Sequence, residues 1–229
     1  MRAMSGKKEP GSTADALIWH ADVRRMLLTQ KAIAEGGRAM IYAAAQTADL
    51  MGDAGRRQDR TTQDKHDDTL GFYTPILKGF LTEMGLEAAN LGMQVFGGHG
   101  YIHEHGMEQI ARDARIATLY EGTTGIQALD LLGRKVLLGT RGKCVRDFSR
   151  IMLRSAKAHW LAHGSIGRMA RSTAKRAIEW NLLTLRIMRR VGKDRDLVGS
   201  ASVDYLMYSG YVMMAHFWVR QAAVAQKFL

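Results

Sequence analysis

Apolar residues recur at intervals of three and four along most of this chain, and no stretch alternates apolar and polar residues as a half-buried strand would. Val23, Met26, Leu27, Ile33 and Ala34 illustrate the pattern. The chain has 229 residues with only two prolines, and its many Ala, Leu, Met and Arg residues favour helices. We therefore predict an all-α fold, built as an antiparallel helical bundle followed by a second, smaller helical domain.

Breaks in the periodicity divide the chain into expected elements. Residues 1–14 are predicted to form a loop, with Asp15 or Asp22 as a possible helix cap. Residues 52–68 contain almost nothing apolar and are predicted to form a surface connection, after which Pro75 is expected in the first turn of the next helix. Helices are predicted over about 16–51, 71–95, 107–116, 126–138, 146–163, 166–191 and 203–227. A break over residues 139–143 predicts a four-helix bundle over 15–140 and an incomplete appended helical domain over 144–229.

The formal net charge of +11 is unevenly distributed. Residues 1–133 carry 14 Lys and Arg against 17 Asp and Glu, whereas residues 134–229 carry 19 against 5. Such asymmetry can indicate binding to nucleic acid or to an anionic membrane surface. The basic residues are scattered at helical spacing without a long run, which favours a solvated helical face, and we expect no nucleic-acid partner.

Other features place the chain in a broad class. No apolar run is long enough for a transmembrane segment, and the first ten residues do not resemble a secretory signal. The single cysteine, Cys144, excludes an internal disulfide framework and suits the cytoplasm. His99, His103 and His105 lie near Glu104, but their spacing matches no helical pair of metal ligands, so we predict no metal site.

One carboxylate lies at an unusual helix break. Glu121 separates an apolar helix end from the turn Gly122-Thr123-Thr124-Gly125, which leads into another helix. In one interpretation, Thr123 or Thr124 simply caps that helix and Glu121 is a solvated acid. In the other, Glu121 is a general base, Gly122 leaves room for a substrate, and the helix start offers N–H groups to an anion or a carbonyl oxygen. The local pattern alone leaves both interpretations open.

Three segments taken together resemble acyl-CoA dehydrogenases. They are Gln94-Val95-Phe96-Gly97-Gly98-His99-Gly100-Tyr101, Arg112-Asp113-Ala114-Arg115-Ile116 and Tyr120-Glu121-Gly122-Thr123-Thr124-Gly125-Ile126-Gln127. Their order and spacing are those of the C-terminal helical domain of that family. The flanking segments are similar to the subgroup with an extra C-terminal helical domain, which includes 3-methylmercaptopropionyl-CoA dehydrogenases and FadE-type bacterial enzymes. The resemblance begins at about residue 15 and is strongest over about 71–138.

The resemblance implies a specific chemistry. Glu121 would remove a proton from the α-carbon of an acyl-CoA, while a hydride leaves the β-carbon for FAD and a trans-2-enoyl-CoA forms. The backbone N–H of Glu121 would polarise the thioester carbonyl, and Glu121 and Gly122 would contact the substrate. The FAD-binding residues implied are Gln94, Val95, Phe96, Gly97, Gly98, Thr123, Thr124 and Gly125. Arg112, Asp113 and Arg115 are expected to be structural.

The resemblance also implies parts that this chain lacks. Family members carry an N-terminal helical domain and a middle β domain before this region, so we expect a partial chain with little activity alone. Its expected partners are an acyl-CoA, an electron-transfer acceptor, and either further copies of itself or a complementing N-terminal chain. The alternatives are a non-catalytic helical module for oligomerisation or complementation, and a basic nucleic-acid-binding module.

Overall fold

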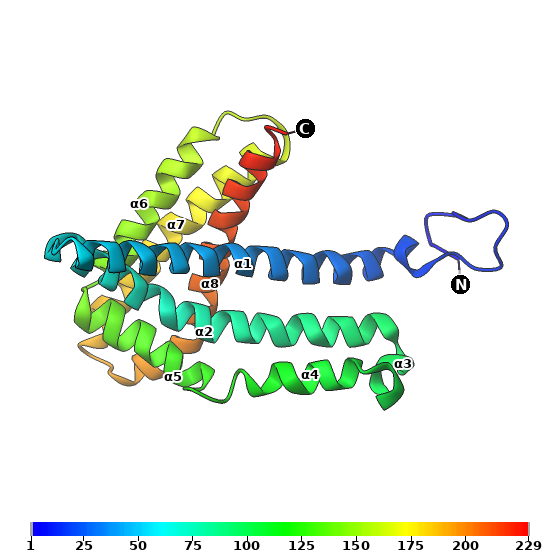
Figure 1. The fold of residues 1–229 in the computed structure, drawn as a ribbon, viewed down its shortest axis with the longest axis horizontal. Helices are drawn as coiled ribbons and strands as arrows, with labels where there is room; N and C mark the ends of the chain where they lie inside the picture. The colour runs from blue at the N-terminus through cyan, green and yellow to red at the C-terminus, as the bar shows by residue number, and fades with distance from the viewer. Residues whose placement is uncertain (1, 229) are drawn as a thin grey trace. The chain divides into compact units, whose positions relative to one another are not determined.

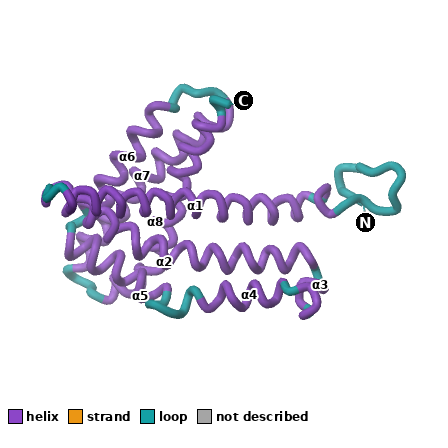
Figure 2. The backbone as a smooth tube through the Cα atoms, in the orientation of Figure 1, coloured by secondary structure: helices purple, strands orange, loops and turns teal. Residues whose placement is uncertain are grey.

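The computed structural model describes residues 2–228, and every regular element in that part of the chain is a helix. The predicted all-α fold is therefore confirmed. Figures 1 and 2 show the helices and the short loops that join them. In chain order the elements are η1 (Leu17–Trp19), α1 (Ala21–Arg56), α2 (Arg60–Phe96), α3 (Gly98–Tyr101), η2 (His103–His105), α4 (Met107–Ile116), α5 (Thr124–Leu129), η3 (Asp130–Gly139), α6 (Lys143–Ala158), α7 (Gly164–Val191) and α8 (Asp196–Ala225). Two of these, η1 and η2, are short 3-10 helices, and η3 is a π-helix.

The chain divides into two compact units. The first comprises Met1–Glu35 and Thr82–Ala117, and the second comprises Gly36–Leu81 and Thr118–Leu229. The long helices α1 and α2 each contribute one part to each unit. The division into a bundle over 15–140 and an appended domain over 144–229 stays a prediction. None of the helices described is both long and apolar enough to cross a bilayer.

The second unit has an aromatic core in which α7 packs against both α6 and α8. Trp180 of α7 is fully buried and stacks on Phe72 of α2, with 6.0 Å between the ring centroids. The hydroxyl groups of Thr184 and Tyr205 lie 2.6 Å apart and join α7 to α8. Burial raises the pKa of the Tyr205 phenol, so this hydroxyl stays protonated.

Two glycines allow α2 to approach its neighbours closely within this unit. A Cβ added at Gly210 of α8 would lie 2.1 Å from Phe80 Cγ, and one added at Gly79 would lie 2.9 Å from Leu206 Cδ2. The Phe80 and Leu206 side chains thus pack against glycine backbone of the facing helix, where a Cβ would clash. This contact fixes the position of α2 in the second unit, including that of Lys78.

In the first unit, the N-terminal segment folds around a buried carboxylate. Asp15 accepts hydrogen bonds from the backbone N–H groups of Ala3, Lys8 and Glu9, at 2.8, 2.8 and 3.0 Å. These bonds, the one from Ala3 foremost, together with Arg2, hold the pKa of Asp15 far below its usual value. Asp15 therefore anchors the preceding loop, and the prediction that it could cap a helix is wrong.

The predicted connection over residues 52–68 is mostly helical. Only residues 57–59 separate α1 from α2, and the Asp59 carboxylate accepts a 3.0 Å hydrogen bond from the Thr62 N–H, as an N-terminal cap does. Polarity misled the prediction, since a solvated helix needs few apolar residues. Pro75 consequently lies in the interior of α2, not in its first turn.

Other boundaries also differ from the prediction. No helix is predicted between residues 95 and 107, but Gly98–Tyr101 form the short helix α3. Instead of 146–163 and 203–227, the structure has α6 over Lys143–Ala158 and α8 over Asp196–Ala225. The helix expected from residue 126 begins at Thr124 and continues as the π-helix η3. The helix over 107–116 is confirmed.

Candidate functional site

The turn that carries Glu121 belongs to the second unit and has an uncommon backbone. Glu121 has φ +52° and Gly122 has φ +91°, and the left-handed region costs a residue with a side chain energy that glycine avoids. The side chains of Tyr120 and Glu121 are exposed. Within residues 2–228, no apolar side chains enclose the Glu121 carboxylate, which is exposed.

Two side chains from outside this turn bind its carbonyl groups. Lys78 Nζ, from α2, donates a 2.7 Å hydrogen bond to Gly122 O. Gln127 Nε2, from α5, donates a 3.2 Å hydrogen bond to Glu121 O. The Lys78 ammonium also lies 5.6 Å from the centroid of the Tyr120 ring. Nothing in the sequence pattern marked Lys78, because it lies 44 residues before Gly122 on a different helix.

Thr123 caps the helix that follows the turn. Its hydroxyl oxygen accepts a 3.4 Å hydrogen bond from the Ile126 N–H, and α5 begins at the next residue, Thr124. The interpretation of Thr123 as a helix cap is thus confirmed. The cap does not exclude the interpretation of Glu121 as a general base. Gly122, Thr124 and Gly125 still lie beside Glu121 in one continuous stretch at the start of α5.

The other predicted FAD-binding segment, Gln94–Gly98, lies in the first unit. Residues 94–96 form the last turn of α2, and Gly97, with φ +61°, separates α2 from α3. A Cβ added at Gly97 or Gly98 would meet no atom within 4 Å, and the Phe96 side chain is exposed. The backbone at Gly97 and Gly98 is therefore accessible to a bound group.

The histidines of the first unit make ordinary surface contacts. His103 Nδ1 lies 3.0 Å from Glu108 Oε1, and the rings of His99 and His105 meet edge to face at 5.2 Å. Within residues 2–228, no group of three or more His, Cys, Asp or Glu side chains is arranged to hold a metal ion.

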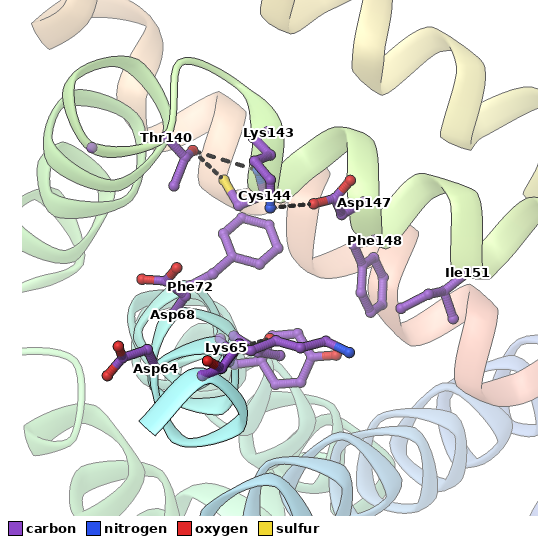
Figure 3. A pocket seen from close by; sticks show the side chains of 14 residues that line it. Asp64, Lys65, Asp68, Phe72, Thr140, Lys143, Cys144, Asp147, Phe148 and Ile151 are labelled. Carbon is purple, nitrogen blue, oxygen red and sulfur yellow. Dashed lines mark hydrogen bonds and ion pairs between the residues drawn. The ribbon is translucent and has the colours of Figure 1, made fainter. Parts of the chain in front are cut away.

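A cavity of about 610 Å³ lies elsewhere in the second unit, between the start of α2 and α6 (Figure 3). Phe72 and Phe148 contribute aromatic surface, and Lys143 pairs with Asp147 at 2.9 Å beside it. Cys144 lines the same cavity, where burial raises the pKa of its thiol and so disfavours the reactive thiolate. None of the predicted site residues lines this cavity.

Comparison with known families accounts for most of the chain. Residues 8–137 match the model of the acyl-CoA dehydrogenase C-terminal domain. Residues 145–229 match the model described as acetyl-CoA dehydrogenase C-terminal like. The first match includes both the Gln94–Gly98 segment and the Glu121 turn.

Curated relatives are similar over more restricted parts of their own length. The chain is 38% identical to 3-methylmercaptopropionyl-CoA dehydrogenase of Ruegeria pomeroyi over 87% of this chain and 34% of that protein. It is 37% identical to a butyryl-CoA dehydrogenase of Syntrophomonas wolfei over 60% of this chain and 22% of that protein. It is also 37% identical to the broad-specificity linear acyl-CoA dehydrogenase FadE5 of Mycobacterium tuberculosis, over 58% of this chain and 21% of that protein. The matched part thus spans about a third or less of each relative, and the chain belongs to the acyl-CoA dehydrogenase family.

Proposed function

We propose that this chain forms part of an FAD-dependent acyl-CoA dehydrogenase and that Glu121 is its catalytic base. One observation carries the proposal: in a chain of this family, an exposed carboxylate lies on a left-handed turn directly before a capped helix start. A left-handed residue with a side chain is uncommon, and such residues cluster at functional sites.

The proposed reaction removes two hydrogens from adjacent carbons of an acyl-CoA. Glu121 takes the proton from the α-carbon, and its own backbone N–H donates to the thioester oxygen, where negative charge develops. When bound, FAD would accept the hydride that leaves the β-carbon, which leaves a trans-2-enoyl-CoA. Gly122 is assigned a backbone contact with the substrate, and its lack of a side chain also admits the Gln127 amide, since an added Cβ would lie 2.8 Å from Gln127 Nε2.

The residues assigned to FAD fit a flat group that approaches the backbone. In the first unit, Gly97 and Gly98 leave open space where side chains would project. In the second unit, a Cβ added at Gly125 would meet only Thr123 Oγ1, at 3.9 Å. We therefore assign Gln94–Gly98 and Thr123–Gly125 to FAD, the first segment reaching the flavin of a neighbouring copy.

The proposal also implies binding partners and a cellular compartment. An electron-transfer acceptor would reoxidise the flavin, and the whole protein would be a homo-oligomer in the cytoplasm. The names of the relatives supply acyl-CoA thioesters to test, which are butyryl-CoA and 3-methylmercaptopropionyl-CoA.

Replacement of the base tests the proposal. Glu121→Gln keeps the size of the side chain and removes its capacity to accept a proton. In a full-length enzyme that carries this chain, we expect kcat with an artificial electron acceptor to fall about 10²–10⁴-fold, the usual cost of losing a general base. Flavin absorbance should remain, because the substitution leaves the turn in place.

A matched control separates loss of the base from loss of any surface acid. Glu104→Gln changes an exposed glutamate of η2 in the first unit and should leave kcat within twofold, as a surface change is expected to do. If Glu121→Gln keeps more than a tenth of the original kcat, Glu121 is not the base.

A further inference from the structure

The backbone conformation of the Glu121–Gly122 turn must be stabilised by residues outside the turn. Glu121 adopts φ +52°, which an isolated glutamate avoids, and the following glycine has φ +91°. A strained backbone persists only where its surroundings determine it. Lys78 and Gln127 each donate a hydrogen bond to one of the two carbonyl groups of this turn.

The two donors differ in how firmly they can fix the position of the turn. Gln127 lies on α5, a few residues after the turn, so it moves with the segment that it holds. Lys78 lies on α2, which α8 contacts closely through Gly79 and Gly210. The lysine therefore ties the turn to a packed part of the second unit, and its charged N–H donates a stronger hydrogen bond than a neutral amide.

The position of Lys78 is itself fixed by its neighbours. The next residue, Gly79, lets α5 come so close that an added Cβ would lie 3.3 Å from Gln127 Cβ. This close approach brings the base of the Lys78 side chain beside the turn. The Tyr120 ring, with its centroid 5.6 Å from Nζ, offers its π-electron face to the ammonium.

We infer that Lys78 is a positioning residue, which holds the turn in the left-handed conformation that presents Glu121 to its substrate. The backbone angle at Glu121 sets the direction of its N–H relative to its carboxylate-bearing side chain. Under the proposed function, on which this inference rests, both groups must meet one thioester. Lys78 thus acts through Glu121 and does not touch the substrate.

The first test measures the backbone and requires no activity. In the 229-residue chain labelled with 13C and 15N glutamate, a strong NOE between the N–H and Hα of Glu121 reports its positive φ. We expect Lys78→Met to abolish this strong NOE, and Lys78→Arg, which keeps a cationic donor, to retain it. Lys143→Met is the matched control, because it removes an ammonium that pairs with Asp147 on α6 and should leave the NOE unchanged.

Two results would overturn the inference at this stage. One is a Lys78→Met chain in which Glu121 keeps its positive φ. The other is a Lys78→Met chain whose α6, α7 and α8 resonances shift as much as those of the turn, since the lysine would then support the whole unit. If Lys78→Met fails to fold, Lys78→Gln, which keeps a shorter neutral donor, should show partial loss of the NOE, and a full-strength NOE would contradict the inference.

The second test measures turnover in a full-length enzyme. We expect Lys78→Met to lower kcat about 10–100-fold with KM changed less than threefold, since small misplacement of a catalytic group has costs of this size. Lys78→Arg should recover most of kcat. The two proposals fail separately: active Glu121→Gln rejects the base, whereas inactive Glu121→Gln with fully active Lys78→Met rejects only the positioning role.

Discussion

At the scale of single residues, His216 shows how burial controls a titrating group. Its ring lies in the core of the second unit, with the Phe148 ring centroid at 5.6 Å and the Phe217 centroid at 5.3 Å. Its Nδ1 is buried without a hydrogen-bond partner in the described part of the chain. Burial, with a smaller contribution from the positive charge of Arg220, lowers the pKa of His216 to about 4.

The depressed pKa predicts a pH-dependent loss of stability. The folded chain keeps His216 neutral down to pH 4, whereas the unfolded chain binds a proton below its ordinary pKa of 6.5. The free energy of unfolding should therefore be unaffected above pH 6.5 and should fall as the pH drops from 6.5 to 4. The loss from this residue should reach about 2–3 kcal/mol at pH 4.5.

Urea unfolding at pH 7.5 and pH 4.5 checks this prediction. Other groups titrate in the same range, so the comparison is between variants. His216→Leu should lose about 2–3 kcal/mol less than the unsubstituted chain between the two pH values. His163→Leu, at an exposed position in the same unit, should behave like the unsubstituted chain. Equal pH dependence in the unsubstituted chain and His216→Leu would show that His216 titrates normally.

Sequence reasoning identified some residues and could not identify others for a physical reason. The Glu121 turn was found because its signal is local: a carboxylate, a glycine and two threonines at a helix start. Lys78 was missed because its hydrogen bond to Gly122 O depends on which turn α2 lies beside. That arrangement follows from packing at Gly79 and Gly210, and no pattern within α2 encodes it.

At the scale of elements, α8 contains two glycines in opposite environments. A Cβ at Gly210 would lie 2.1 Å from the buried Phe80 ring, whereas a Cβ at Gly199 would meet nothing within 4 Å. Both residues are inside the helix, so alanine improves the local helix propensity equally at each. Alanine substitution at these two positions therefore distinguishes the effect of packing from the effect of helix propensity within one helix.

Alanine at these two positions should have opposite effects. Gly210→Ala should lower the free energy of unfolding by about 1–3 kcal/mol or more, because α2 and α8 must move apart. Gly199→Ala should raise it by about 0.5–1 kcal/mol. Chemical denaturation of the two variants measures both changes. A Gly210→Ala chain as stable as the unsubstituted one would mean that α2 and α8 do not pack at this point.

Element boundaries were predictable where apolar periodicity was strong. The helix over 107–116 agrees with the prediction. Residues 60–68, however, form the polar start of α2, which apolar periodicity cannot detect. Pro75 was misplaced for the same reason, since the assumed start of α2 came too late. The π-helix η3 was not predicted, because its residue types also favour an α-helix.

At the scale of the whole molecule, the residues assigned to chemistry are unusually open. The side chains of Glu121 and Thr123 are exposed in the second unit, as are Phe96, Gly97 and Gly98 in the first. Residues 134–229 carry 19 Lys and Arg against 5 Asp and Glu, so acidic side chains of the same segment can pair with only part of this positive charge, as Asp147 does with Lys143 and Arg150. The absence of a nucleic-acid partner stays a prediction.

This openness predicts how the chain behaves by itself. Catalysis of this type requires the base, the acyl chain and the flavin to be held in one orientation and shielded from water. Because its carboxylate faces solvent, the 229-residue chain alone should release FAD during gel filtration and should not reduce an artificial acceptor with acyl-CoA. The Ruegeria pomeroyi relative, treated identically, is the positive control.

Fusion to the remaining two thirds of a relative should reverse both results. When this chain replaces the matched third of the R. pomeroyi enzyme, we expect the chimera to retain flavin absorbance through gel filtration. The same chimera with Glu121→Gln should also retain flavin, because the residues assigned to FAD are intact. If the 229-residue chain alone elutes yellow with one flavin per chain, its exposed segments already form a complete flavin site, and openness in this chain would no longer indicate dependence on other domains.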